Sequence, residues 1–122
     1  MSRKQILIVE DEPLLRKNIV EILNTLQIWD IIDTSSATKA LEMLDTLQPA
    51  LIISDYKMPG INGLEFLRIL RQRDSTKNTP FIFLTAKMDI AAEFDDSQTT
   101  IVYKPFSLKV LLQHLMARLK NE

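Results

Sequence analysis

The sequence of 122 residues contains no cysteine, one histidine and two glycines, and each shortage excludes a class of chemistry. Without cysteine the chain has no disulfide, no thiolate nucleophile and no cysteine metal site. The one imidazole, His114, excludes zinc sites built from several histidines. Gly60 and Gly63 are too few for a dinucleotide-binding fingerprint or a glycine-rich phosphate loop. Any phosphate chemistry must therefore use side chains and a metal ion.

An excess of one charge and long apolar runs are also missing. Fifteen Lys and Arg residues against 16 Asp and Glu residues give a formal net charge of -1, so no broad basic surface is expected to bind nucleic acid directly. No apolar run reaches the length that crosses a bilayer, and only a short one precedes the first acids. We therefore expect a cytoplasmic protein without membrane contact. Its 46% apolar content predicts one globular domain, residues 1–122.

Short apolar runs alternate with amphipathic stretches along the chain. Runs rich in β-branched and aromatic residues are typical of strands buried on both faces of a parallel sheet. The predicted strands are residues 6–9, 29–32, 51–53, 81–84 and 101–103. Helical spacing follows each of them, although residues 89–94 leave room for less than two turns. The pattern predicts an α/β, flavodoxin-like (βα)5 fold: a doubly wound five-stranded parallel sheet of order 2-1-3-4-5 with a shortened fourth helix.

Polar side chains follow four of the predicted strands. Glu10 and Asp11 follow the first, Asp55 the third, Thr85 the fourth and Lys104 the fifth. Doubly wound sheets bind ligands beyond the carboxyl ends of their strands, near the point where the strand order reverses. We therefore expect these side chains to meet at one site.

The acids of this site predict a bound cation. In the expected strand order the first and third strands are neighbours about 4.8 Å apart, so Asp11 and Asp55 would face each other across roughly 5 Å. At an effective dielectric constant of about 20 their repulsion is about 3 kcal/mol, and Glu10 adds to it. Either the carboxylates share a proton or a cation lies among them. Oxygen ligands without histidine or thiolate favour Mg²⁺.

The formal charges of the site suit phosphoryl transfer. Three carboxylates are balanced by the charge of Lys104 and the two charges of Mg²⁺, so the loaded site would be neutral. A neutral site that holds a cation tolerates a dianionic phosphoryl group. Asp55 could attack phosphorus in line while Lys104 and the metal hold the equatorial oxygens, and Thr85 could donate its hydroxyl to one of them.

At these residues the sequence resembles the receiver domain of two-component response regulators. Four segments carry the resemblance, and together they cover essentially the whole chain. They are the acid pair after the first strand, a phosphoacceptor loop, a switch-threonine segment and a Lys-Pro-Phe turn, at residues 6–12, 54–63, 84–86 and 103–106. In this family the Lys-Pro bond of that turn is usually cis.

The resemblance implies that Asp55 is the phosphoacceptor and that Glu10, Asp11 and the Lys57 carbonyl help to hold Mg²⁺. The phosphodonor would be a sensor histidine kinase or a histidine phosphotransfer protein. A conformational change would then control a downstream protein or an attached output domain. Such a domain is not an enzyme for external substrates, because it catalyses only its own phosphorylation and dephosphorylation.

By the same resemblance, Lys104 contacts the phosphoryl group and Thr85 reports its arrival by turning inward. The family usually carries Tyr or Phe three residues before this lysine, and rotation of that ring accompanies activation. Here the position is Ile101, and Tyr103 lies two residues later. Because Ile101 has no ring and the fourth helix is short, we expect an altered output and no dimer through the fourth and fifth helices.

The sequence is also compatible with other interpretations. A phosphatase with an aspartyl nucleophile would need a second acid soon after Asp55, and the next residues supply none. A receiver fold could also act as an interaction module without phosphorylation. Lys57 and Lys87, two residues after Asp55 and Thr85, could be solvent-facing or could change the lifetime of the phosphoryl group. Arg71 is expected on the solvated face of the third helix.

Overall fold

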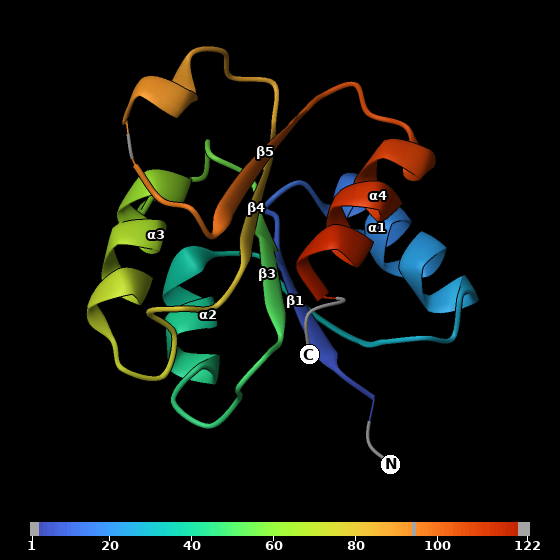
Figure 1. Ribbon diagram of the computed structural model, residues 1–122, viewed down its shortest axis with the longest axis horizontal. Helices are drawn as coiled ribbons and strands as arrows, with labels where there is room; N and C mark the ends of the chain where they lie inside the picture. The colour runs from blue at the N-terminus through green and yellow to red at the C-terminus, as the bar shows by residue number, and fades with distance from the viewer. Residues whose placement is uncertain (1–2, 94, 120–122) are drawn as a thin grey trace.

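The computed structural model describes residues 3–93 and 95–119, and Phe94, at the end of the predicted fourth helix, lies outside them (Figure 1). Strands alternate with helices along the described chain. In order they are β1 (Gln5–Val9), α1 (Pro13–Thr25), β2 (Asp30–Thr34), α2 (Ala37–Met43), β3 (Leu51–Ser54), α3 (Gly63–Gln72), β4 (Phe81–Thr85), the 3-10 turn η1 (Ile90–Glu93), β5 (Thr99–Tyr103) and α4 (Leu108–Leu119). The five strands form one parallel sheet of order β2-β1-β3-β4-β5, which confirms the predicted fold.

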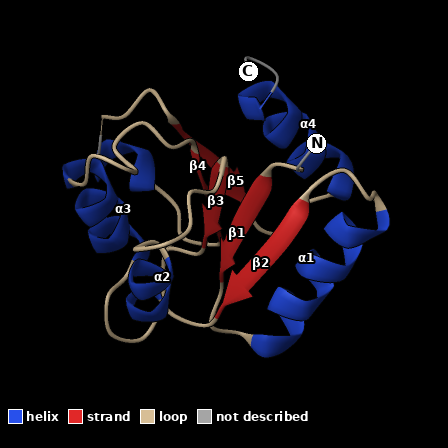
Figure 2. Ribbon diagram, turned by 90° about the horizontal axis from the view of Figure 1, so that it is seen from below, coloured by secondary structure: helices blue, strands red, loops and turns tan. Residues whose placement is uncertain are grey.

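Helices cover both faces of this sheet. Figures 1 and 2 show α1 and α4 on one face and α2 and α3 on the other. Side chains alternate between the faces along each strand, so every strand contributes to two apolar cores. In β1, Leu7 packs toward α2 and α3, whereas Ile6 and Ile8 pack toward α1 and α4. No helix in residues 3–93 and 95–119 has the length and apolar content to span a bilayer.

The strand register brings the ends of the strands to one edge, at the top of Figure 1. Val9 of β1 lies beside Thr34 of β2 and Ser54 of β3. β2 therefore runs two residues further than predicted, because it pairs with β1 along the whole of that strand. Hydrogen bonding continues past the strand ends, where the Asp55 N–H donates to the carbonyl of Val9 at 3.2 Å. The strand register therefore fixes where along the sheet each site residue lies.

The predicted fourth helix is reduced to η1, the orange turn beside α3 in Figure 1. The chain then folds back over α3, where the Arg71 Nε lies 2.6 Å from Asp96 Oδ2 and its Nη1 donates to the Thr76 carbonyl at 2.9 Å. The predicted solvated position of Arg71 is therefore wrong, since its side chain is only 19% exposed. Burial by itself would raise the pKa of Asp96, but the hydrogen bonds from Arg71 and the Gln98 N–H and the charge of Arg71 together lower it.

The loop between β3 and α3 packs tightly through Gly63. Asn62 caps α3 in a reciprocal capping box with Glu65, and the Gly63 N–H donates to the Tyr56 carbonyl at 2.7 Å. A Cβ on Gly63 would lie 2.8 Å from the Cα of Tyr56 and 2.9 Å from Phe83 Cε1, and it would overlap the carbonyl oxygen of the preceding Asp55. The missing side chain therefore lets the start of α3 lie directly against the loop.

We expect Gly63→Ala to lower the free energy of unfolding by about 2–3 kcal/mol, because backbone atoms cannot yield as a flexible side chain can. Gly60→Ala is the matched control, since its Cβ would meet nothing within 4 Å and only its φ of 76° is unfavourable. That control should cost about 1 kcal/mol. Urea unfolding of both variants measures the difference, and a greater loss in Gly60→Ala would contradict the packing described.

Candidate functional site

Three carboxylates meet at the carboxyl edge of the sheet. One carboxylate oxygen from each of Glu10, Asp11 and Asp55 lies within 4.8 Å of the other two. Glu10 is buried, with 2% of its surface exposed, whereas Asp11 and Asp55 are partly exposed. The structure therefore brings together the acids that the sequence placed after the first and third strands. Oxygen donors at this spacing are suited to a small, hard cation.

Lys104 balances part of this negative charge. Its Nζ lies 2.7 Å from Asp55 Oδ2 and 3.4 Å from Glu10 Oε1. Burial by itself would lower the pKa of Lys104, but the hydrogen bonds to Asp55 and Glu10 and the charges of both carboxylates together outweigh burial and raise it. The lysine therefore stays charged at neutral pH, and it touches the carboxylate on which the sequence predicts phosphorylation.

The two oxygens of Asp55 have different partners. Oδ1 accepts a hydrogen bond from the Tyr56 N–H at 2.6 Å and a longer one from the Lys57 N–H at 3.4 Å, whereas Oδ2 faces Lys104. These contacts fix the plane of the carboxylate. An open cavity of about 390 Å³ adjoins this loop, lined by Asp11, Tyr56, Lys57, Met58, Pro59 and Asn62.

Thr85 and the turn after β5 complete the arrangement. The Thr85 side chain is 1% exposed, and its Oγ1 accepts a hydrogen bond from the Lys87 N–H at 3.1 Å. Its carbonyl accepts a hydrogen bond from the Lys104 N–H at 2.8 Å, which ties the end of β4 to the end of β5. The Lys104–Pro105 peptide bond is cis, as the resemblance implied.

Beside the carboxylates lies a contact that sequence reasoning missed. The Tyr56 hydroxyl donates a hydrogen bond to Glu93 Oε1 at 2.7 Å, and this bond raises the pKa of Tyr56 to about 12. The Lys87 Nζ lies 5.2 Å from the centre of the Tyr56 ring and 3.9 Å from Glu93 Oε2. No local signal marked Glu93, which is 37 residues from Tyr56 in a polar stretch without periodicity.

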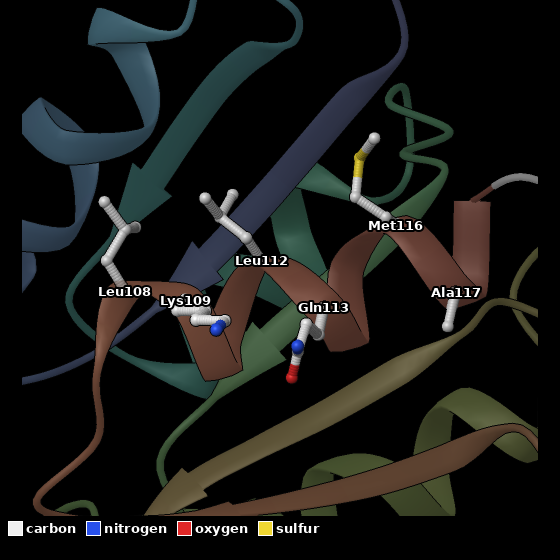
Figure 3. A pocket seen from close by; sticks show the side chains of 6 residues that line it. All are labelled: Leu108, Lys109, Leu112, Gln113, Met116 and Ala117. Carbon is white, nitrogen blue, oxygen red and sulfur yellow. The ribbon is translucent and has the colours of Figure 1, made fainter.

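A second cavity lies on the outer face of α4 and does not belong to this site. Figure 3 shows Leu108, Leu112 and Met116 along one side of the helix. Its volume is about 780 Å³, and it is lined by Leu108, Lys109, Leu112, Gln113, Met116 and Ala117. Because it contains no acid and one cation, it offers no donor set for a metal or for phosphoryl chemistry.

Fold and site together define a class: a doubly wound α/β domain with an acidic cluster and a lysine at the carboxyl edge of its sheet. Residues 6–116 match the family described as the response regulator receiver domain. The chain belongs to this family of two-component signalling domains.

Proteins of similar sequence include a response regulator. The chain is 31% identical over 122 residues to the DNA-binding response regulator MtrA of Mycolicibacterium smegmatis, with 98% of this chain and 52% of the relative covered. It is 33% identical over 120 residues to the transcriptional regulatory protein TrcR of Mycobacterium tuberculosis, with 96% and 46% covered. The chain therefore spans about half the length of these curated relatives.

Solved structures show the same fold. The response regulator TrrA of Thermotoga maritima, solved in complex with Mg²⁺ and BeF, has a TM-score of 0.84 at 29% identity and covers 95% of this chain and 99% of its own. The receiver domain of a signal transduction histidine kinase from Syntrophus aciditrophicus has a TM-score of 0.86 at 28% identity, with 96% and 90% covered. These similarities fit a receiver fold along nearly the whole chain.

Burial raises the pKa of Glu10 to about 7, and the neighbouring charge of Asp55 adds to the rise. The unfolded chain releases this proton near pH 4.5, so between the two values the folded state binds more protons. Stability from this group is therefore full below the lower value and is lost as pH rises through the higher one.

In protein freed of metal by a chelator, Glu10→Gln should remove the loss of folding stability that accompanies rising pH. Between about pH 5 and about pH 8 the free energy of unfolding of the wild type should fall relative to that of the variant by on the order of 1–3 kcal/mol. Urea unfolding at several pH values measures it. Asp74→Asn, which removes a fully exposed carboxylate, should follow the wild type. Parallel curves for the wild type and Glu10→Gln would contradict the raised pKa.

Proposed function

We propose that this receiver domain accepts a phosphoryl group on Asp55 in a reaction that depends on Mg²⁺. One observation carries the proposal: the Asp55 carboxylate is held between backbone N–H donors on Oδ1 and the Lys104 ammonium on Oδ2, beside Glu10 and Asp11. A carboxylate fixed in this way is oriented as a nucleophile.

In the proposed reaction an oxygen of Asp55 forms a bond to phosphorus while the bond from phosphorus to the donor breaks. The Lys104 ammonium stabilises the negative charge of the transferring oxygens. Once the group is in place, Thr85 turns inward and donates its hydroxyl proton to one of these oxygens, and its Oγ1 gives up the hydrogen bond that it accepts from the Lys87 N–H. Hydrolysis of the acyl phosphate returns Asp55 to its carboxylate form.

The donor set fits Mg²⁺, because three carboxylates with no imidazole or thiolate provide the oxygen ligands this ion prefers. Glu10, Asp11, Asp55 and the Lys57 carbonyl would hold it. When bound, the ion neutralises charge on the transferring phosphoryl group. The Mg²⁺ and BeF found in the TrrA complex support this assignment, since that protein resembles this chain over 95% of its length.

The phosphodonor in this proposal is a sensor histidine kinase or a histidine phosphotransfer protein, whose phosphohistidine gives its phosphoryl group to Asp55 and is left as free imidazole. Phosphorylation would then control a downstream protein or an attached output domain. MtrA is described as a DNA-binding regulator and extends well beyond the matched region, which supports an output outside the part aligned here. For residues 1–122 themselves the net charge of -1 favours protein partners over direct contact with nucleic acid.

Incubation with Mg²⁺ and a small acyl phosphate should add one phosphate to the protein, because the site itself activates Asp55. Intact-mass spectrometry measures the addition. Asp55→Asn should lose it, since the amide is not nucleophilic, whereas the control Asp74→Asn should retain it. An unmodified wild type under these conditions would favour a phosphorylation-independent interaction module.

Mg²⁺ should also stabilise the protein, because a ligand that binds the folded state alone shifts the equilibrium toward it. At ten times the dissociation constant the gain is about 1.4 kcal/mol. Thermal unfolding with and without MgCl₂ measures it. Asp11→Asn should lose most of the gain and Asp74→Asn should keep it. Equal gains in both variants would place the ion outside the acidic cluster.

A further inference from the structure

Side chains, and not backbone hydrogen bonds, hold η1 against the rest of the domain. In the described residues no backbone hydrogen bond joins η1 to another element. Ile90 is fully buried in the core beside α2 and α3, and Asp96, after the turn, pairs with Arg71. Glu93, at the end of η1, supplies a further attachment. The position of η1 therefore depends on a few side-chain contacts.

Glu93 receives two such contacts, one on each carboxylate oxygen. The Tyr56 hydroxyl donates to Oε1 at 2.7 Å, and the Lys87 ammonium lies 3.9 Å from Oε2. Lys87 also lies over the Tyr56 ring, so the three side chains form one cluster. The Tyr56 ring in turn packs on Phe83, with ring centres 5.8 Å apart.

The two residues that contact Glu93, Tyr56 and Lys87, also form hydrogen bonds at the proposed site of phosphorylation. The backbone N–H of Tyr56 donates to Asp55 Oδ1 at 2.6 Å, and the backbone N–H of Lys87 donates to Thr85 Oγ1 at 3.1 Å. The residues that would carry and sense the phosphoryl group are therefore each one hydrogen bond away from a residue that holds Glu93.

We propose that Glu93 is the residue through which phosphorylation is read: Tyr56 and Lys87 hold it, and with it η1, while Asp55 is unmodified, and phosphorylation releases η1. This inference rests on the proposed function of Asp55. It also supplies a route for the signal in a chain whose position 101 is isoleucine and has no ring to turn.

Charge and hydrogen bonding give the direction of the change. An acyl phosphate carries more negative charge than the carboxylate it replaces, so it attracts the Lys87 ammonium away from Glu93. When Thr85 turns its hydroxyl toward a phosphoryl oxygen, the Lys87 N–H loses its acceptor as well. Glu93 is then left with Tyr56 alone, whose own N–H is bonded to the carboxylate that has changed. η1 should open locally and expose surface beside α3.

Hydrogen–deuterium exchange of peptides that cover Ile90–Glu93, with and without Mg²⁺ and beryllium fluoride as the phosphoryl mimic, tests the inference. In the wild type the mimic should raise the exchange rate there several-fold. Tyr56→Phe keeps the ring and the N–H but removes the bond to Glu93, so its η1 should exchange rapidly already without the mimic. Tyr103→Phe, which removes a hydroxyl from an exposed ring on β5, should behave as the wild type.

Glu93→Gln provides a second variant, because it keeps an acceptor for Tyr56 and loses the ion pair with Lys87. Its exchange without the mimic should lie between those of the wild type and Tyr56→Phe. Calorimetric titration of beryllium fluoride separates the two proposals. Binding without any change at η1, or equal exchange in Tyr56→Phe and the wild type, overturns the role of Glu93 and leaves that of Asp55 intact. If the wild type neither binds the mimic nor gains a phosphate, the proposed function fails and the role of Glu93 fails with it.

Discussion

Three carboxylates meet at the edge of the sheet, two of them in contact with Lys104, and this balance of charge governs the rest of the site. Glu10 is buried and has a pKa raised to about 7, so the metal-free protein carries an acid that is costly to ionise. Lys104 relieves part of that cost through Asp55 and Glu10. Because the carboxylates at this edge repel one another, the site is suited to bind a cation. Membership of the receiver family is consistent with a cation site at this edge.

The loop after β3 keeps these charges in place. Gly63 allows α3 to begin against the backbone of Asp55, and the capping box at Asn62 fixes where the helix starts. Tyr56 then directs its N–H to Asp55 and its hydroxyl to Glu93. Tyr56 therefore connects the Asp55 carboxylate with η1 through two hydrogen bonds.

The features that depart from the family resemblance lie on the output side. Ile101 is partly buried and packs against the core beside α2 and α3, in register with Phe83 of β4. An aliphatic side chain there fills space and cannot rotate as a ring can. The neighbouring η1 is a single 3-10 turn attached by side chains. The domain therefore keeps the acids and the lysine of the resemblance at its sheet edge, whereas within the described residues no backbone hydrogen bond ties η1 to another element.

The sequence by itself determined the sheet, its order and the acids at its edge, because apolar runs locate the strands and parallel topology brings their ends together. Tertiary structure alone decided the depth of Glu10, the burial of Arg71 against Asp96 and the contact between Tyr56 and Glu93. The two latter pairs lie 25 and 37 residues apart. Their partners depend on the path of irregular loops, for which the pattern of apolar residues carries no signal. The ends of strands can be predicted from the local pattern of apolar residues, whereas polar contacts between loops depend on how the whole chain folds.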